Sequence, residues 1–352
     1  MKHFVTKRDL PYKNLNVINE DARKYLEISK TIKTKHVVDM TDLFTTQQTL
    51  RQSVKCTGVG VHSGAEANLL LKPAPVDHGI TFVRTDITDK NNVVPAKWDN
   101  VTETQLCTVL ANNDGVSVST VEHLLSAMAA LGVHNAIIEI DGPEVPIMDG
   151  SAEPFVFLIE CTGITDQKAP IKAIRITDTV TYTEDGKTSE LRPSTKTSYS
   201  FDIDFGDTII GKQHFSIDMQ KQRYKAEISQ ARTFGFLHEV EMLRNMGLCR
   251  GGSLENAIVI DGDNIMNENG LRYPDEFVRH KILDAIGDLY LAGMPIIGHY
   301  HGDKAGHAMN NKILHKLFAS PECFEIVTLS APTMDVVMTP VVETAVKMQA
   351  HA

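Results

Sequence analysis

The sequence lacks the cysteine spacing that indicates a disulfide framework or a cysteine-based metal site. Its five cysteines, Cys56, Cys107, Cys161, Cys249 and Cys323, are dispersed, and no Cys-X-X-Cys pair occurs. An odd, scattered set in a chain of 352 residues is typical of reduced thiols in a cytoplasmic protein. We therefore predict a cytoplasmic location and a fold that does not depend on disulfides.

Long hydrophobic runs are absent as well. No stretch approaches the roughly 18 consecutive apolar residues that indicate a membrane-spanning helix. The first residues carry no apolar core of a secretory signal, and Asp9, Glu20 and Asp21 stand where a transit peptide has few acids. We expect no transmembrane segment and no targeting peptide.

The sequence has no surplus of positive charge. Its 35 Lys and Arg residues are outnumbered by 45 Asp and Glu residues, which gives a formal net charge of −10. Because broad nucleic-acid binding needs a basic face, we expect no nucleic-acid partner. A local basic pocket for an anionic small molecule stays open. With 42% hydrophobic and 23% charged residues, the composition is that of a globular protein with a real core.

The pattern along the chain predicts four parts. Residues 1–45 are polar and weakly periodic, which indicates an N-terminal extension, flexible or partly helical. Residues 46–167 and 168–336 each run through strands, a histidine-bearing helix, a glycine, a strand and a further helix, and residues 337–352 form a tail. This repeat predicts an α+β fold of two similar domains, each a β-sheet layered against α-helices, with the active site at the domain interface.

Hydrophobic spacing and turn residues predict the individual elements. Helices are expected at residues 120–131, 152–161, 231–246, 277–292 and 308–318. Strands are expected at residues 49–61, 66–71, 80–84, 135–140, 173–182, 199–205 and 296–300. Ser119 or Thr120 should lie near the N-cap of the first helix, and Gly132 should end it.

Two of the predicted helices carry side chains that could bind one metal ion. The first contains His123, and the second contains His280 and Asp284, which are four residues apart and therefore share a helix face. Lys281 and Asp288 lie beside the second pair, and both helices are otherwise largely apolar, so their charges need partners. The alternative for His280 and Asp284 is a hydrogen-bonded pair on a helix surface. Three ligands with one open position would make a catalytic zinc site.

A carboxylate lies next to the first candidate ligand. Glu122 precedes His123, and beside a metal-bound water it could take the proton as the water attacks, which typically contributes about 10²–10⁴-fold in rate. The alternative is an ion pair at the helix N-terminus, where Glu122 would favour the helix dipole.

His307 is a candidate proton donor. It follows a glycine at a predicted loop-to-helix junction, and a nearby carboxylate such as Asp288 would favour its protonated form. In that form it could protonate a leaving amine. The alternative is an ordinary residue of the first helical turn. His299 and His301 lie in the same region, so the sequence does not choose among the three.

Six motifs, in this order, resemble the UDP-3-O-acyl-N-acetylglucosamine deacetylases, zinc amidases that carry out the committed step of lipid A biosynthesis in Gram-negative bacteria. The resemblance runs from about residue 47 to about residue 329. The motifs are Thr-Gly-Val-Gly-Val-His-Ser-Gly at 57–64, Ser-Thr-Val-Glu-His-Leu at 119–124, Pro-Ile-Met-Asp-Gly-Ser-Ala at 146–152, Ala-Arg-Thr-Phe-Gly-Phe at 231–236, Phe-Val-Arg-His-Lys-Ile-Leu-Asp-Ala-Ile-Gly-Asp at 277–288 and Gly-His-Ala-Met-Asn at 306–310.

The resemblance implies roles for the matching residues. Zinc, or ferrous iron in the cell, would be bound by the three candidate ligands. Glu122 would be the general base on zinc-bound water, and His307, positioned by Asp288, would be the general acid for the glucosamine nitrogen. Thr233 and zinc would stabilise the oxyanion, and Lys281 would lie near polar groups of the substrate. The metal ligands would be His123, His280 and Asp284.

The resemblance also implies the substrate and its surroundings. The protein would be a monomer that hydrolyses the 2-N-acetyl group of a UDP-linked 3-O-acylated glucosamine, with an insert at about residues 237–262 forming a passage for the acyl chain. Two alternatives are an amidase for another acylated amino sugar and a binding protein without turnover. Ala305, where the family commonly has serine, departs from the pattern. The implied substrate contacts are His62, Cys107, Phe234, Val240, Leu254, Ala257 and Val259.

Overall fold

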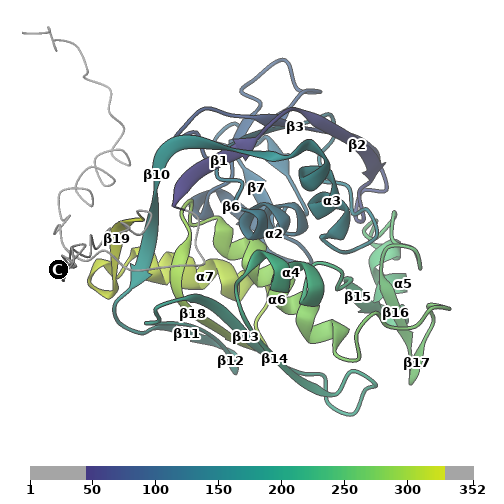
Figure 1. The fold of residues 1–352 in the computed structure, drawn as a ribbon. Coiled ribbons are helices and arrows are strands. Elements are labelled where there is room, and N and C mark those ends of the chain that lie inside the picture. Colours follow the sequence, from purple (N-terminus) through teal and green to yellow (C-terminus); the bar gives the residue numbers. More distant parts are fainter. Residues whose placement is uncertain (1–44, 330–352) are drawn as a thin grey trace, which may run out of the picture.

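The computed structural model describes residues 45–329, and these form a layered α+β structure (Figure 1). Helices lie between a sheet formed early in the chain and a larger sheet formed mostly by its second half. The predicted α+β class is therefore confirmed. The expected partial helix within residues 1–45 and the tail at 337–352 lie outside the described residues, apart from residue 45. None of the described helices is long and apolar enough to cross a membrane.

The first large sheet has five strands, and its inner face is made by alternating apolar residues. In its second strand Ala67, Leu69 and Leu71 are buried while their neighbours are more exposed, as expected for a strand with one face on the core. The strands, in spatial order, are β2 (Val54–Val59), β3 (Glu66–Pro73), β9 (Ala136–Ile140), β4 (Ile80–Arg84) and β5 (Val93–Pro95). A smaller sheet follows, with β6 (Val101–Glu103), β7 (Val109–Ala111) and β8 (Ser117–Val118).

The second large sheet has eight strands. Its main path is β1 (Thr46–Leu50), β10 (Ile164–Ile176), β18 (Ile296–Asp303), β12 (Lys187–Arg192) and β11 (Val180–Glu184), joined by β13 (Thr197–Asp204), β14 (Lys212–Asp218) and β19 (Phe324–Leu329). β10 continues without interruption through residues 167 and 168, where the predicted domain boundary falls. The strand predicted at 173–182 is two strands, because β10 ends at Ile176 and β11 begins at Val180.

A third unit lies beside the layers and corrects one predicted helix. It contains β15 (Phe234–Phe236), α5 (Leu237–Asn245), β16 (Ile258–Asp261) and β17 (Asn264–Ile265). The helix predicted from residue 231 begins only at residue 237. Phe234 and Phe236 instead pair in parallel with Ile258 and Ile260, so tertiary pairing of two aromatic residues overrides the helical spacing.

The remaining helices agree with the predicted ones in type and closely in bounds. They are α2 (Glu122–Leu131), α3 (Glu153–Thr162), α6 (Glu276–Tyr290) and α7 (His307–Phe318), with a short unpredicted α4 (Lys221–Glu227) and 3-10 turns at Trp98–Asn100 and Pro321–Cys323. Gly132 ends α2 in the left-handed conformation (φ 76°), as expected. The N-cap is Val121, directly after Thr120, and the Thr120 hydroxyl bonds Glu144 at 3.0 Å instead of capping the helix.

α2 and α6 pack against each other, and a glycine sets how closely they approach. A Cβ atom on Gly287 of α6 would lie 2.0 Å from the carbonyl oxygen of Glu122 on α2. No side chain larger than hydrogen fits at this crossing without separating the two backbones. The crossing brings the two predicted metal-binding helices together.

Candidate active site

The three predicted ligands meet at the crossing of α2 and α6. His123 lies in the first turn of α2, and His280 and Asp284 lie one turn apart on α6. Asp284 Oδ1 is 3.6 Å from His123 Nε2 and 3.4 Å from His280 Nε2, and all three side chains are buried. One ligand atom from each lies within 4.8 Å of the other two. The three side chains thus form one compact group with two nitrogen donors and one oxygen donor.

The group has a polar atom that the protein does not satisfy. Asp284 Oδ1 is buried and has no hydrogen-bond partner among the described residues, although both imidazoles face it. The other carboxylate oxygen of Asp284 accepts a hydrogen bond from Lys281 Nζ at 2.8 Å. A buried, unpaired carboxylate oxygen is costly, and two histidines with one carboxylate are a common zinc ligand set. The residues therefore fit a metal ion with three protein ligands.

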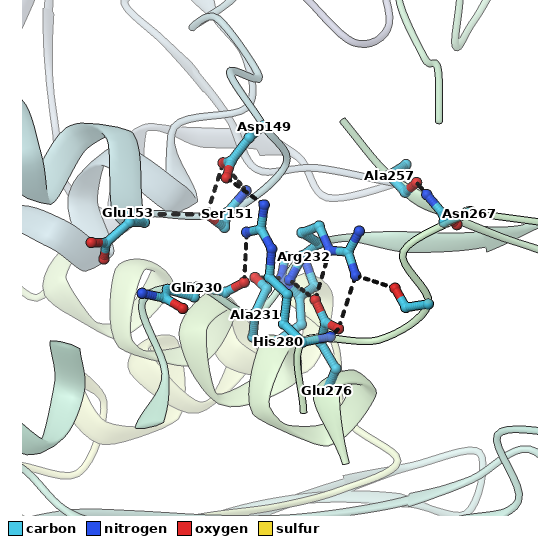
Figure 2. A network of polar contacts seen from close by, with 12 residues as sticks. Asp149, Ser151, Glu153, Gln230, Ala231, Arg232, Ala257, Asn267, Glu276 and His280 are labelled. Carbon is cyan, nitrogen blue, oxygen red and sulfur yellow. Dashed lines mark hydrogen bonds and ion pairs between the residues drawn. The ribbon is translucent and has the colours of Figure 1, made fainter. Parts of the chain in front are cut away.

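The orientation of His280 is set by the backbone of a neighbouring segment. Its Nδ1 lies 3.0 Å from the carbonyl oxygen of Ala231 (Figure 2), and its Nε2 lies 3.4 Å from Asp284 Oδ1. Burial, and then the nearby His123 and Lys281, lower the pKa of His280 to about 3 despite the attraction of Asp284. The ring is therefore neutral at physiological pH, as a metal-binding imidazole must be.

Glu122 precedes the candidate ligand His123 on α2 and faces His307, a third histidine outside the ligand group. Its Oε2 accepts a hydrogen bond from the backbone N–H of Thr108 at 3.1 Å, and its Oε1 is 3.9 Å from His307 Nε2. Burial raises the pKa of Glu122 above its usual value, although His307 and His123 oppose the rise. A carboxylate with a raised pKa is suited to taking and giving a proton near neutral pH.

His307 is held by a buried carboxylate. Its Nδ1 lies 2.9 Å from Asp288 Oδ2. Burial lowers the pKa of His307, but the charges of Asp288 and Glu122 outweigh it and raise the pKa to about 9. Asp288 is itself fixed by the Thr108 hydroxyl at 2.6 Å and the Asn310 amide at 2.9 Å. His307 is therefore a protonated imidazolium of fixed orientation at neutral pH.

The structure separates His307 from the two other histidines in its region. His299 and His301 both lie on β18, where their ring nitrogens contact serine hydroxyls of β13. Ser200 lies within 2.9 Å of both rings. His307 alone of the three contacts Asp288 among the described residues.

Sequence reasoning missed several groups of this site. Asn310 could have been found from the sequence. It stands three residues after His307 in the motif at 306–310, so it lies on the same side of α7. Thr108 and the Ala231 carbonyl carried no such signal in the sequence, because each reaches the site only through a tertiary contact. The sequence also gave no indication of the role of Glu144. Its buried carboxylate accepts hydrogen bonds from the backbone N–H groups of His62 at 2.9 Å and Ser63 at 2.8 Å.

Some of the predicted substrate contacts lie close to the group of His123, His280 and Asp284, and others lie further away. The ring of Phe234 lies 6.2 Å from the ring of His280, and Lys281 Nζ is 5.5 Å from the centre of the Phe234 ring. Cys107 is buried, and burial followed by the charge of Glu122 raises its thiol pKa to about 12. These residues border the histidines and Glu122. Thr233 precedes Phe234, and its backbone N–H donates to Gly150 at 2.9 Å.

The other predicted contacts belong to the loop of His62 and to the third unit. His62 Nδ1 lies 3.8 Å from Cys249 Sγ, and burial lowers the pKa of His62. Val240 lies on α5, Val259 is buried on β16, and the segment between these elements holds Leu254, which is 42% exposed, and Ala257.

Comparisons with known proteins identify the family of this chain. The model of the family described as UDP-3-O-acyl N-acetylglycosamine deacetylase matches residues 47–319. Proteins named UDP-3-O-acyl-N-acetylglucosamine deacetylase are similar over most of both chains. The relative from Shewanella woodyi is 49% identical over 80% of this chain and 93% of its own, that from Phenylobacterium zucineum 48% over 81% and 97%, and that from Myxococcus xanthus 50% over 80% and 89%. The chain therefore belongs to the UDP-3-O-acyl N-acetylglycosamine deacetylase family, whose members are hydrolases that act on an amide bond.

Proposed function

We propose that this protein hydrolyses the 2-N-acetyl group of UDP-3-O-((R)-3-hydroxyacyl)-N-acetylglucosamine, giving UDP-3-O-acyl-glucosamine and acetate, in the committed step of lipid A biosynthesis. The names of its relatives support the substrate class. The observation that carries the proposal is the convergence of a carboxylate and an imidazolium beside the group of two histidines and one aspartate. Glu122 Oε1 and His307 Nε2 are 3.9 Å apart next to that group.

The metal would be zinc, with ferrous iron as the alternative in the cell, held by His123, His280 and Asp284. The unpartnered Asp284 Oδ1 supports this assignment. When bound in such a site, the ion polarises a carbonyl and lowers the pKa of water towards about 7.

Glu122 would act as the general base. Its pKa is raised by burial, so the carboxylate can accept the proton of the attacking water and later release it. One oxygen is already occupied by the Thr108 N–H. The other oxygen lies 3.9 Å from His307 Nε2, and water and the amide carbonyl would meet beside it.

His307 would act as the general acid. Asp288 and Glu122 keep it protonated at neutral pH, and the contact between Nδ1 and Asp288 leaves Nε2 as the donor. Cleavage of the amide releases an amine, which needs a proton to leave. His307 Nε2 would supply that proton to the glucosamine nitrogen, and Asp288 would hold the ring in place throughout.

Thr233 would donate to the oxyanion that forms on the amide carbonyl, and such a donor is commonly worth about 3 kcal/mol. Support comes from its position, since hydrogen bonds to Gly150 and Ile258 fix its backbone. Lys281, which pairs with Asp284 and lies over the Phe234 ring, would contact polar groups of the substrate.

The third unit would receive the acyl chain. Phe234 contacts the His280 ring and begins β15, and the insert at about 237–262 follows this strand.

The predicted two-domain division, with the site at the interface, is supported by the position of the α2–α6 crossing between the two large sheets. The cytoplasmic location is supported by the five free cysteines. The monomeric state stays a prediction from the family resemblance.

The test is acetate release from a UDP-3-O-acyl-N-acetylglucosamine substrate, measured together with the metal content of the purified protein. We expect stoichiometric metal and turnover that a hydroxamate chelator abolishes. A chain that binds the nucleotide sugar but releases no acetate would be a binding protein. Release from other acylated amino sugars alone would establish the related amidase instead.

A further inference from the structure

We propose that Glu276 and Arg232 form a clamp that positions the metal ligand His280 through the carbonyl of Ala231. Neither residue would contact the reacting atoms, so both are positioning residues. The inference rests on the metal-binding role of His280 in the proposed function. It assigns a role to a buried ion pair that the mechanism above does not use.

The carboxylate of Glu276 is completely buried and accepts hydrogen bonds on both oxygens (Figure 2). Oε1 accepts from the backbone N–H of Arg232 at 3.0 Å and from its Nε at 2.8 Å. Oε2 accepts from Arg232 Nη2 at 3.1 Å and from the backbone N–H of Arg272 at 2.6 Å. Arg232 is thus held by its main chain and its side chain together.

The clamp and the metal ligand are one helical turn apart. Glu276 precedes His280 by four residues on α6, so both side chains project from one face of the helix. Their partners are adjacent in sequence, because Glu276 holds Arg232 and His280 Nδ1 meets the carbonyl of Ala231. The peptide between these two residues is therefore fastened to α6 at two points. Its position fixes the direction of the carbonyl and hence of the imidazole ring.

A second arm braces the same segment from outside α6. The guanidinium of Arg272 bonds the carbonyl of Gln230 at 2.9 Å and Asp149 Oδ2 at 2.9 Å. Asp149 belongs to the turn whose Gly150 carbonyl accepts the N–H of Thr233. The segment that supplies the His280 partner and the proposed oxyanion donor is thus held at both ends.

Stability alone is a weak reason for such a pair. Removing two charges from water is costly, and apolar residues of similar volume often serve folding as well. Groups that orient a metal-binding histidine, however, typically change metal affinity 10–100-fold when removed. The other imidazole differs, since His123 Nδ1 is buried without a partner among the described residues. The clamp therefore acts on the one histidine whose ring is fixed by a backbone carbonyl.

The test is the zinc affinity of Glu276→Gln, measured by competition with a chromogenic chelator. All four partners of the Glu276 carboxylate are N–H donors. In the glutamine variant the side-chain NH2 group would face some of these donors and could not accept their hydrogen bonds. We expect affinity to fall about 10–100-fold in a protein that still unfolds cooperatively. The matched control is Asp275→Asn, which removes the adjacent carboxylate and breaks its pair with Arg279 without touching the clamp. Its zinc affinity should stay within about twofold.

Arg232→Lys is the second variant, for the case that Glu276→Gln does not fold. It keeps the positive charge and the backbone contact but loses the forked guanidinium geometry. Zinc affinity should fall again, and the double variant should bind zinc no more weakly than Glu276→Gln alone. Zinc affinity within twofold of the unaltered protein in the folded variants would overturn the clamp.

Acetate release by the unaltered protein separates this inference from the proposed function. The unaltered protein could bind zinc but release no acetate, while the variants bind zinc weakly. That result would refute the proposed function and support the clamp. Turnover by the unaltered protein with undiminished zinc affinity in the variants refutes the clamp alone. An unaltered protein without zinc affinity would refute both.

Discussion

Replacing Gly287 by alanine should damage the active site more than the fold. The added Cβ would lie 2.0 Å from the carbonyl oxygen of Glu122 and 2.8 Å from its carbonyl carbon. Ordinary van der Waals contact begins at 3.4 Å. Since both obstacles are helix backbone, α2 and α6 must separate by about 1.4 Å, the difference between 2.0 and 3.4 Å.

This separation acts on the two halves of the site. α2 carries Glu122 and His123, while α6 carries His280 and Asp284, so the base and one ligand move away from the other two ligands. A misplacement of about 1 Å can cost on the order of 10²-fold in rate. Overpacking costs about 1–3 kcal/mol of stability, partly offset by roughly 1 kcal/mol from the higher helix propensity of alanine. We therefore expect a large fall in kcat in a protein that still folds.

The assay is acetate release at saturating substrate and zinc, together with thermal unfolding and zinc affinity. The matched control is Gly302→Ala on β18, where an added Cβ would meet the Phe201 ring at 2.5 Å. That clash lies within the eight-stranded sheet, so it should lower the unfolding temperature and leave kcat of the folded protein unchanged. A Gly287→Ala enzyme with kcat within twofold of the unaltered protein would refute the reasoning.

Three further variants address single residues. Glu122→Ala should lose about 10²–10⁴-fold in kcat with zinc retained, and near-normal turnover would exclude it as the base. His280→Ala should lose zinc on dialysis, as elemental analysis would show, whereas full occupancy would contradict the ligand set. His307 has a pKa raised to about 9, so its acid form dominates below that pH and the rate should fall as pH rises through it. In His307→Gln this alkaline limb should disappear, and a rate profile of unchanged shape would exclude the acid role.

The helices of the site were predictable because their information is local. Apolar spacing and Gly132 located α2, and the spacing of His280 and Asp284 placed both on one face of α6. The motif order identified the family, and the comparisons agree. Of the helix predicted at 231–246 only Leu237–Asn245 forms, because Phe234 and Phe236 pair with β16 further along the chain.

The contacts that tune the site were not predictable in the same way. The proton of His307 is held by Asp288, which is fixed by Thr108, the residue that precedes β7. The direction of the His280 ring depends on the carbonyl of Ala231, and a backbone carbonyl leaves no mark in a sequence pattern. Thr120 stands next to the N-cap of α2, as expected, but its hydroxyl bonds Glu144 and not the helix backbone.

The sequence by itself determined which residue types could meet and on which elements, because periodicity and turn residues act over a few positions. The tertiary structure decided which of them do meet and how closely. It selected His307 from three histidines by its contact with Asp288, and it left Asp284 Oδ1 buried without a partner among the described residues. It also set the spacing of α2 and α6 through Gly287. These outcomes depend on the burial and orientation of groups distant in sequence, and only the packed chain defines them.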